Sequence, residues 1–520
     1  MKKYLFIYTM GAVLVAGNTG CSKFDEINTN PNKSTSVSSG MLATTMILSI
    51  TRSDISTTKG FMQPYLLGKY MTWGEGQESF QYNRFGRANF NRLTLLRNVP
   101  PMIDAAPDEA LRNSYKALGH FVRAWQFFQT TMQVGDIPYT QAVKGESEDI
   151  IQPAYDPQKT VFLGILNELD SANLFFEKGS NFAGDPIFGG KADNWRRVAN
   201  SFQLHVLMQL YRKTGDADLK VIDRFRDVVA NRPLLRSYAD NFALTYNATA
   251  GQNYPWSDVP AGSGNSFVKS NYTMLSKTLI DPLKALQDRR LFYYAKPSPV
   301  KISGGLTMSD WNAYPGVEPS DNFSSLQSQR VGKDYADINN RYVNLVNAEP
   351  VSVFSYAELQ FVLAEAALRG WITGTPAQEY YAAGIKDAMK FTAAYTPDLA
   401  DFHHNMKMDD AYIDAYPSTV AVALAGSPEE QLSQIITQKY LAGFLQGANY
   451  NAWYENRRTG YPVFVLNPAT NLNTPSTSFP RRWLYPSNEL SYNTNNLDAA
   501  IQRQYAGNDD FNENMWILRD

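Results

Sequence analysis

Apolar side chains recur at three- and four-residue spacing over much of this chain, which is the pattern of amphipathic helices. One such stripe runs from Phe354 to Leu368, starts beside the capping-box serine Ser355 and ends before Gly370. Residues 193–213 are apolar on nearly every side, which predicts a central helix. Three other helices are predicted to begin at Asp156-Pro157, Thr375-Pro376 and Ser427-Pro428. Further helices are expected over about 41–52, 89–105, 108–132, 216–230 and 275–288.

Long stretches without such periodicity separate the predicted helices. They cover about 240–274, 295–350, 394–426 and 460–510. Loops of this length in a compact domain are usually functional or contain small local elements. The short connections between the other helices predict antiparallel helical hairpins. We therefore expect a mainly α protein, in which an irregular, aromatic-rich part packs against a helical scaffold.

The first twenty residues have the layout of a removable secretion signal. Lys2 and Lys3 precede an apolar run over 4–16, which is too short to span a membrane because that requires about 20 residues. The one cysteine of the chain, Cys21, follows directly and predicts a bacterial lipobox, in which the thiol receives a diacylglycerol. Asn18 departs from the apolar residue that is usual three positions before such a cysteine. The alternative is an ordinary secreted protein with an incidental thiol.

The segment behind Cys21 is poor in apolar residues and rich in Ser, Thr and Asn, which predicts a flexible tether over 21–40. A segment of roughly 19 residues can reach about 60 Å when extended. Each buried methylene of an acyl chain contributes about 0.8 kcal/mol, so two or three chains hold a protein durably on a bilayer. We expect the protein to be held on a membrane by this lipid anchor.

Composition and motifs exclude several classes of function. The chain has 48 Lys and Arg against 50 Asp and Glu, a balance that argues against nucleic-acid binding. It contains no glycine-rich phosphate loop, nucleophile elbow or His-Glu-x-x-His pattern. His403 and His404 lie near Asp401, but adjacent histidines on an irregular segment have poor chelating geometry. We therefore expect no catalytic residues, no metal and no cofactor, although the sequence leaves open a dispersed carboxylate pair.

Aromatic residues make up 13% of the chain, and many lie among Gly, Asn and Ser in the irregular stretches. A pyranose stacks its C–H groups on the face of a Trp or Tyr ring, while its hydroxyls need polar side chains at the rim. Residues 70–87 and 246–272 supply both ingredients. The alternative is that the loop rings anchor the loops to the core. The predicted ligand-binding residues are Trp73 and Tyr82, Tyr254 and Trp256, and Trp311 with Tyr314.

A set of short motifs, in this order behind the lipobox, resembles the SusD/RagB lipoproteins, in particular the SusD-like branch. The resemblance covers about 24–520. Gln438-Lys439-Tyr440 is followed by Trp453-Tyr454-Glu455 and Arg457-Arg458, for which we expect mainly structural contacts of the guanidinium groups. The other motifs are Gly135-Asp136-Ile137-Pro138-Tyr139, Asp193-Asn194-Trp195-Arg196, Tyr356-Ala357-Glu358-Leu359-Gln360-Phe361, Pro480-Arg481-Arg482 and Tyr485-Pro486 with Glu489 and Asn493.

The resemblance implies a scaffold of helix pairs similar to tetratricopeptide units. It also implies a non-enzymatic protein that is lipid-anchored to the outer membrane and exposed on the cell surface. It also implies that the protein captures oligosaccharides and passes them to a SusC-like TonB-dependent transporter. Two alternatives stay open, a peptide-binding member of the same family and a helical glycoside hydrolase or lyase. The expected division of the chain is a signal peptide (1–20), a lipidated tether (21–40), a helical scaffold (41–240 and 351–460) and an irregular ligand-binding subdomain (240–350 and 460–520).

Overall fold

The computed structural model describes residues 37–52, 59–259, 272–447 and 450–520. The predicted signal peptide, Cys21 and most of the predicted tether lie outside the described residues. The longer helices are α3 (Ser39–Thr51), α7 (Glu109–Val134), α9 (Gln158–Lys178), α10 (Ala192–Gln209), α11 (Val221–Asn231), α12 (Lys277–Ala285), α15 (Phe323–Gly332), α17 (Tyr356–Leu368), α18 (Ala377–Ala394), α21 (Pro428–Ala442), α22 (Asn451–Thr459) and α24 (Thr494–Tyr505).

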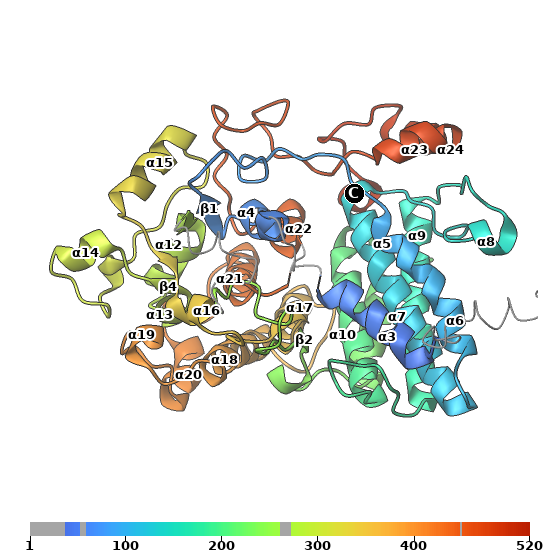
Figure 1. Ribbon diagram of the computed structural model, residues 1–520, viewed down its shortest axis with the longest axis horizontal. Helices are drawn as coiled ribbons and strands as arrows, with labels where there is room; N and C mark the ends of the chain where they lie inside the picture. The colour runs from blue at the N-terminus through green and yellow to red at the C-terminus, as the bar shows by residue number, and fades with distance from the viewer. Residues whose placement is uncertain (1–36, 53–58, 260–271, 448–449) are drawn as a thin grey trace, which may run out of the picture.

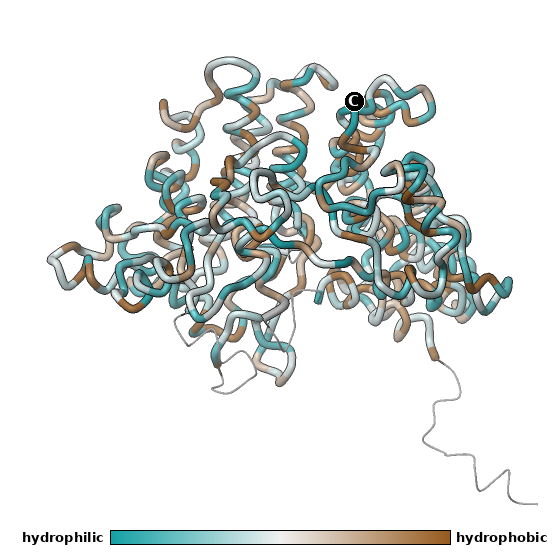
Figure 2. Tube along the Cα trace, turned by 90° about the horizontal axis from the view of Figure 1, so that it is seen from above, coloured by the Kyte–Doolittle hydropathy of each residue, from teal (hydrophilic) through white to brown (hydrophobic). Residues whose placement is uncertain are grey.

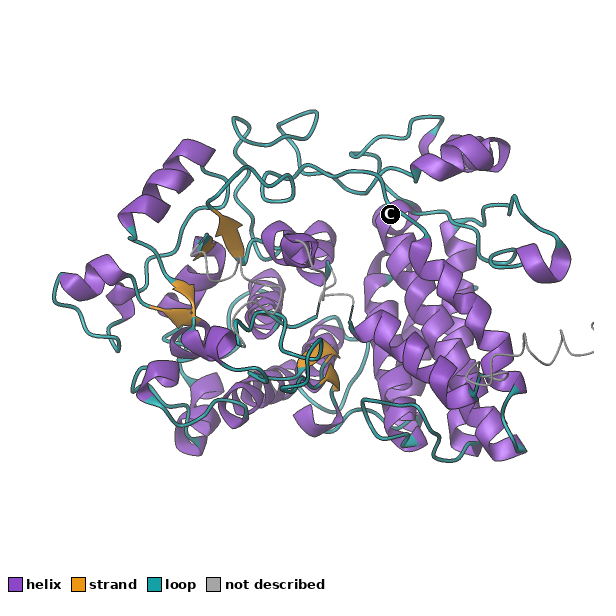
Figure 3. Ribbon diagram, in the orientation of Figure 1, coloured by secondary structure: helices purple, strands orange, loops and turns teal. Residues whose placement is uncertain are grey.

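Short elements connect these helices. The short helices are α4 (Gln63–Leu67), α5 (Asn91–Thr94), α6 (Val99–Asp104), α8 (Gly145–Glu148), α13 (Leu291–Tyr294), α14 (Pro299–Ser303), α16 (Asn340–Asn344), α19 (Ala400–His403), α20 (Asp410–Ala415) and α23 (Ser487–Tyr492). The strands are β1 (Met71–Trp73), β2 (Phe242–Leu244), β3 (Thr273–Leu275), β4 (Ala295–Lys296), β5 (Asp337–Ile338) and β6 (Val351–Phe354). Figure 3 shows how far the helices outweigh the strands, which confirms the predicted mainly α fold.

The helices form two groups that meet in the middle of the molecule (Figure 1). On one side α7 packs along α9, and α9 packs against α10. On the other side α17 packs along α18 and against α21. Contact between α10 and α17 joins the two groups, so the paired-helix scaffold that the sequence predicts extends through both.

Rings from α7 and α10 fill the core between these helices. Trp125 of α7 lies with its ring centroid 4.5 Å from that of Phe202 on α10, and Phe128 lies 5.4 Å from the same ring. Both α7 rings follow the helical spacing that the sequence predicts, and Asp108 caps the helix by accepting a hydrogen bond from the backbone N–H of Leu111.

The helix predicted over 89–105 is wrong as a single element. The chain instead forms α5, a 3-10 turn over Leu95–Asn98, and α6. Pro100 and Pro101 occupy the first turn of α6. Since proline has no backbone N–H and clashes with the preceding turn, it fits at a helix start but not in its interior.

Within the part of the chain that the structure describes, three two-stranded antiparallel sheets tie the irregular stretches to the scaffold. In one of them β1 pairs with β3, with Trp73 opposite Thr273. In another sheet β2 pairs with β6, the strand that lies directly before α17 in the chain. The first pairing brings an early loop next to a segment about two hundred residues later, which is the geometry on which the candidate site depends.

Hydrophilic and hydrophobic residues are mixed along the described helices. Seen from above in Figure 2, hydrophilic and hydrophobic positions alternate along the helical tubes. Within the described residues, no helix combines the length and the hydropathy needed to cross a bilayer.

Candidate functional site

The six rings predicted to bind ligand have different environments in the folded protein. Protein atoms cover five of the six rings in this conformation. For all six rings, ligand binding stays a prediction. The buried rings, each at most 2% exposed, are Trp73, Tyr82, Tyr254, Trp256 and Tyr314, and the half-buried ring is Trp311.

The rings beside the early loop form a layered cluster. Trp73, at the end of β1, lies with its ring centroid 5.3 Å from that of Tyr272, which directly precedes β3. Tyr272 is half-buried, and the guanidinium group of Arg330 lies 4.9 Å from its ring centroid. Arg330 also donates from Nε to the carbonyl oxygen of Gly74 at 3.2 Å. The β1–β3 pairing and α15 thus place a tyrosine and an arginine side by side at the surface.

Polar side chains follow directly after β1. Glu75 and Gln77 are exposed, and Glu78 is half-buried. Beneath them, the side chain of Gln81 accepts a hydrogen bond at 2.7 Å from the backbone N–H of Trp73. These polar residues belong to the predicted stretch 70–87, and Gly74, just before them, bonds to the backbone of Tyr272 and to Arg330. The combination of ring, guanidinium, carboxylate and amide suits a hydroxyl-rich ligand.

A buried lysine holds this loop. Lys69 lies between α4 and β1 and is 2% exposed. Its Nζ donates at 2.6 Å to the carbonyl oxygen of Gln81 and at 2.6 Å to the side-chain oxygen of Asn83. Burial lowers the pKa of Lys69 to about 7, and Glu318 opposes this shift. A neutral amine still has two N–H groups, which match the two acceptors.

Tyr82 belongs to a small cluster under the same loop. Its neighbours are Met274, Val317, Leu326 and Tyr335, all buried. Burial raises the pKa of Tyr82 to about 12. The ring anchors the loop from below, while the side chains of 75–78 remain at the surface.

Trp256 and its neighbour Tyr254 lie in the core. The ring of Trp256 contacts those of Phe61 and Tyr65, at centroid distances of 4.8 and 5.7 Å. Tyr254 lies parallel to Tyr342 at 6.0 Å. Both are 1% exposed, so in this structure they fit the alternative interpretation, namely rings that attach an irregular segment to the core.

Trp311 and Tyr314 both pack edge-on against Phe292, at 4.7 and 5.3 Å. The hydroxyl of Tyr314 lies 2.7 Å from Nδ1 of His404, and burial lowers the pKa of that imidazole to about 4. Trp311 keeps part of its surface exposed, so among the six predicted rings it is the one that reaches solvent in this structure.

The adjacent histidines His403 and His404 contact different partners. His404 contacts Tyr314, whereas His403 lies with Nε2 2.9 Å from the carboxylate of Asp398. Among the described residues, no group of three or more His, Cys, Asp or Glu side chains is placed to hold a metal ion.

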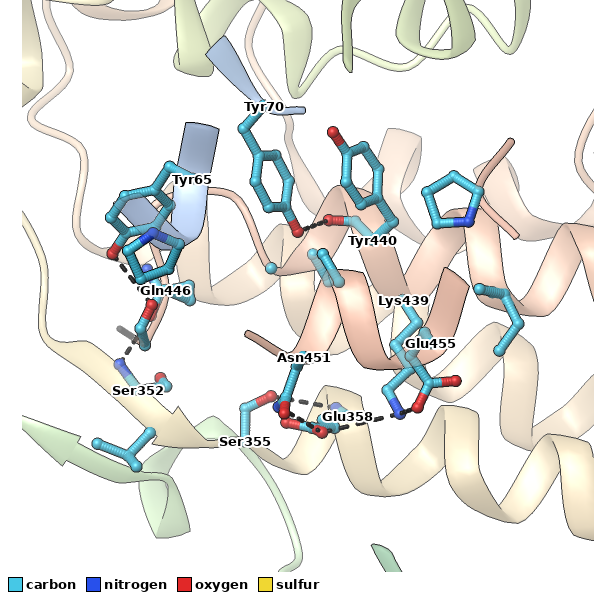
Figure 4. Close-up of a pocket in the computed structure, with 18 residues that line it drawn as sticks. Tyr65, Tyr70, Ser352, Ser355, Glu358, Lys439, Tyr440, Gln446, Asn451 and Glu455 are labelled. Carbon is cyan, nitrogen blue, oxygen red and sulfur yellow. Dashed lines mark hydrogen bonds and ion pairs between the residues drawn. The ribbon is translucent and has the colours of Figure 1, made fainter. Parts of the chain in front are cut away.

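A small cavity of about 70 Å³ lies between α4, β6, α17, α21 and α22 (Figure 4). Tyr70 and Tyr440 stack over it with ring centroids 4.2 Å apart, and Tyr70 donates to the carbonyl oxygen of Tyr440. Ligand pockets usually have about 300–1,000 Å³. A cavity of this size holds a few water molecules, so we assign it to the scaffold.

Buried charges next to this cavity link α17, α21 and α22. Arg458 of α22 donates to both carboxylate oxygens of Glu365 on α17, at 2.6 and 2.7 Å, and to Glu455 at 2.5 Å. Lys439 of α21 lies 3.3 Å from Glu455 and 3.7 Å from Glu358. This network confirms the structural contacts expected for Arg458.

The same network determines the charge of its carboxylates. Burial opposes the ionisation of Glu455, but Arg458 and Lys439 outweigh it and keep the pKa of Glu455 well below its usual value. Glu358 lies 3.0 Å from Nδ1 of His205 on α10. Glu358 and Glu365 therefore pair with different cations, which is the arrangement of a structural network joining the two helix groups.

Sequence reasoning identified the stretch 70–87, which includes this loop, but missed two of the loop's supports, Lys69 and Arg330. A lone lysine inside the apolar run from Phe61 to Trp73 is a local signal that marks Lys69. Arg330 has no such signal, since it is 256 positions from the carbonyl group it contacts.

Comparison with known proteins identifies the family. The family described as "Starch-binding associating with outer membrane" (SusD-like) matches residues 31–486. A solved SusD homolog from Bacteroides fragilis is 42% identical, covers 93% of this chain and 100% of its own, and superposes with a TM-score of 0.88. A second one from the same species is 32% identical with the same coverage and a TM-score of 0.79. No curated protein matches the chain.

A chitin-binding SusD homolog from Flavobacterium johnsoniae shares the fold, with 23% identity, a TM-score of 0.68 and coverage of 93% of this chain and 98% of its own. Members of the family are carbohydrate-binding proteins of the outer membrane. The matched span and the identity of the first relative leave one conclusion: this chain belongs to the SusD-like family of starch-binding proteins that associate with the outer membrane.

Proposed function

We propose that this protein captures oligosaccharides at the cell surface and delivers them, unaltered, to a TonB-dependent outer-membrane transporter. The observation that carries the proposal is membership of the SusD-like family over residues 31–486. Its mechanism is capture and release. The protein binds the glycan reversibly above the pore and so raises the local concentration of ligand there.

The ligand face that we propose consists of Glu75, Gln77, Glu78, Tyr272 and Arg330. The ring of Tyr272 offers an apolar surface for the C–H groups of a sugar, and Arg330, which lies over part of that ring, supplies donors. The exposed side chains of Glu75 and Gln77 supply acceptors and an amide. A buried hydroxyl left without a partner costs about 1–3 kcal/mol, so this density of polar groups favours a hydroxyl-rich ligand over an apolar one.

Among the rings predicted from sequence, we propose Trp311 as an additional stacking surface and Trp73 as the support behind Tyr272. Tyr82, Tyr254, Trp256 and Tyr314 would then maintain the shape of the loops and not contact the sugar.

Isothermal titration of the purified soluble domain tests the ligand class. The panel contains starch oligosaccharides, chitin oligosaccharides and unrelated peptides of equal length. Saturable binding of at least one glycan supports the proposal. Binding of peptides alone would replace it with the peptide-binding alternative.

Chromatography of glycans after long incubation tests whether the protein is an enzyme. We expect the bound glycan to be recovered intact. Cleavage that is abolished by one Asp or Glu substitution would contradict the non-enzymatic proposal.

We also propose that Cys21 carries the lipid anchor. Replacing it (Cys21→Ala) should release the protein from the membrane and abolish incorporation of labelled palmitate. Label that still enters the variant would contradict the assignment of the lipobox.

A further inference from the structure

The proposed ligand face is assembled from two segments that are far apart in the chain. Gln77 and its polar neighbours belong to the loop after β1, whereas Tyr272 directly precedes β3. A ligand that contacts both segments binds well only where they are held at a fixed spacing before it arrives, because ordering them on binding costs free energy. A residue that fixes this spacing therefore contributes to affinity without touching the ligand.

Lys69 makes hydrogen bonds to both segments. Its Nζ donates to the carbonyl oxygen of Gln81 and to Oδ1 of Asn83, each at 2.6 Å. Its own carbonyl oxygen accepts a hydrogen bond from the hydroxyl of Ser276, the residue that follows β3. The end of the polar loop and the strand that begins after Tyr272 are thus joined through one residue.

Gln81 passes this restraint to the base of the loop. It is fully buried, and its side-chain oxygen accepts from the backbone N–H of Trp73 at 2.7 Å. The backbone N–H of Gly74 in turn donates to the carbonyl oxygen of Tyr272 at 2.8 Å. Residues 74–80 therefore leave the core beside Tyr272 and return to it at Gln81, so a shift of Gln81 would move the polar side chains relative to the ring.

The backbone is strained at both ends of one of these hydrogen bonds. Lys69 has a φ of 56°, and Asn83 has a φ of 62°. The left-handed region is uncommon for residues other than glycine, and lysine, unlike asparagine, has no short polar side chain that stabilises it locally. Such a conformation persists where the surroundings impose it, and it clusters at sites that hold ligands.

Stability alone does not account for this arrangement. Lys69 and Asn83 are each 2% exposed. Burying an amine costs free energy, which hydrogen bonds to two neutral acceptors offset only in part. Methionine at position 69 would avoid this cost, and glycine at position 83 would adopt the left-handed φ without strain. The polar contact therefore lowers the stability of the fold, and a role in positioning the loop explains its presence.

We propose that Lys69 is a positioning residue for glycan binding, which fixes the polar loop at 74–80 relative to the ring of Tyr272. This inference rests on the proposed function, because it takes the ligand face from there. Its rival is a purely structural role, in which loss of the amine changes the free energy of unfolding and leaves the glycan affinity of the folded protein unchanged.

Two substitutions in the full-length protein weaken the contact to different extents. Lys69→Met removes both hydrogen bonds of Nζ and keeps a side chain of similar length. Asn83→Gly removes one of them, and glycine suits the φ of 62° at this position, so this variant should fold even where Lys69→Met does not. Lys277→Met is the control, since Lys277 is exposed on α12. Denaturant unfolding verifies that each variant is folded at the temperature of titration.

Titration calorimetry with maltohexaose and chitohexaose measures the affinities. For whichever glycan the wild type binds, Lys69→Met should weaken affinity by about tenfold and Asn83→Gly by about threefold, because a loosely held loop must be ordered on binding. Lys277→Met should bind as the wild type does. Wild-type affinity in Asn83→Gly, and in Lys69→Met where it folds, would overturn the inference and leave the proposed function intact.

A double-mutant cycle separates positioning from a general loss of structure. Gln77→Ala should weaken binding in the wild type and much less in the Lys69→Met or Asn83→Gly background, because a displaced loop no longer presents Gln77 to the ligand. Trp311→Ala, at the separate stacking surface, should have the same effect in every background. Equal effects of Gln77→Ala in all backgrounds would overturn the inference. Glycan binding that neither Gln77→Ala nor Tyr272→Ala changes would overturn the ligand face and the inference together, and failure of the wild type to bind either glycan would overturn the proposed function as well.

Discussion

The loop at 74–84 and the segment at 246–259 both place aromatic rings among polar residues, but the folded protein treats them differently. In the first, Tyr82 is buried, but Glu75 and Gln77 are exposed, and the backbone N–H of Gly74 donates to the carbonyl oxygen of the half-buried Tyr272. In the second, Tyr254 and Trp256 are each 1% exposed. The difference shows that composition alone does not make a ligand face. What matters is whether a neighbouring element covers the rings.

The covering elements explain the outcome. Phe61 and Tyr65 pack directly on Trp256. Beside Tyr272 the neighbour is Arg330, a long polar side chain that covers part of one ring and leaves polar groups at the surface. Trp256 is enclosed by other rings and stabilises the fold, whereas the half-buried Tyr272 keeps part of its surface exposed to solvent.

The largest effect is expected from Trp256→Ala. Removing a buried ring should lower the free energy of unfolding by about 3–5 kcal/mol because it leaves a cavity in the core. Denaturant unfolding measures the change, and the glycan affinity of the remaining folded protein should be unaltered. A stable variant with weakened glycan binding would reverse the assignment of the two segments.

Lys69, which holds the loop after β1, should make stability depend on pH. The pKa of Lys69 is lowered to about 7 in the folded protein, whereas an unfolded lysine keeps its proton up to about pH 10.4. Between these values the unfolded state binds more protons, so the free energy of unfolding should rise with pH by at most about 1.4 kcal/mol per pH unit.

Lys69→Met should remove this rise, whereas replacing the exposed Lys277 with Met should not. Comparing the three proteins by denaturant unfolding at pH 7, 8 and 9 isolates the contribution of Lys69 from other groups that titrate in this range. Parallel curves for wild type and Lys69→Met would show that the buried lysine keeps its proton.

Tyr272→Ala should act on binding more than on stability. Loss of a half-buried stacking ring is expected to weaken glycan affinity by about 1–2 kcal/mol, measured by titration calorimetry. Tyr395→Ala is a matched control, because Tyr395 is 39% exposed at the end of α18. Equal affinities for both variants would remove Tyr272 from the ligand face.

The smallest effect is expected from Gln77→Ala. One lost hydrogen bond to a sugar hydroxyl should weaken binding by about 0.5–1.5 kcal/mol without a measurable change in unfolding. An affinity that stays the same with every glycan in the panel would place the ligand elsewhere on the loop.

Much of the scaffold was predictable because its signals are local. The helix predicted over 108–132 is α7 at Glu109–Val134, and the helix predicted to begin at Ser427-Pro428 is α21. Ser355 caps α17 by accepting from the backbone N–H of Glu358, whereas the Glu358 carboxylate lies at His205. Where local signals compete, prediction failed, as with Pro100 and Pro101 inside the expected helix at 89–105. The irregular stretches contain short helices and strands, as expected for loops of that length, but α24 lies in one of them as a helix of 12 residues that was missed.

The candidate site was only partly predictable. The polar residues at 74–78 could be chosen from composition, because they are adjacent in the sequence. Their neighbours could not, since Tyr272 and Arg330 come from distant segments that β-pairing and α15 bring to the loop.

The sequence by itself determined the helical scaffold and the presence of ring-bearing loops, since helix caps, apolar spacing and aromatic content act over a few residues. Only the tertiary structure decided which rings are buried and which reach solvent. Burial depends on contacts between residues far apart in the chain, such as Trp256 with Phe61 or Arg330 with Gly74, and no local pattern encodes those contacts.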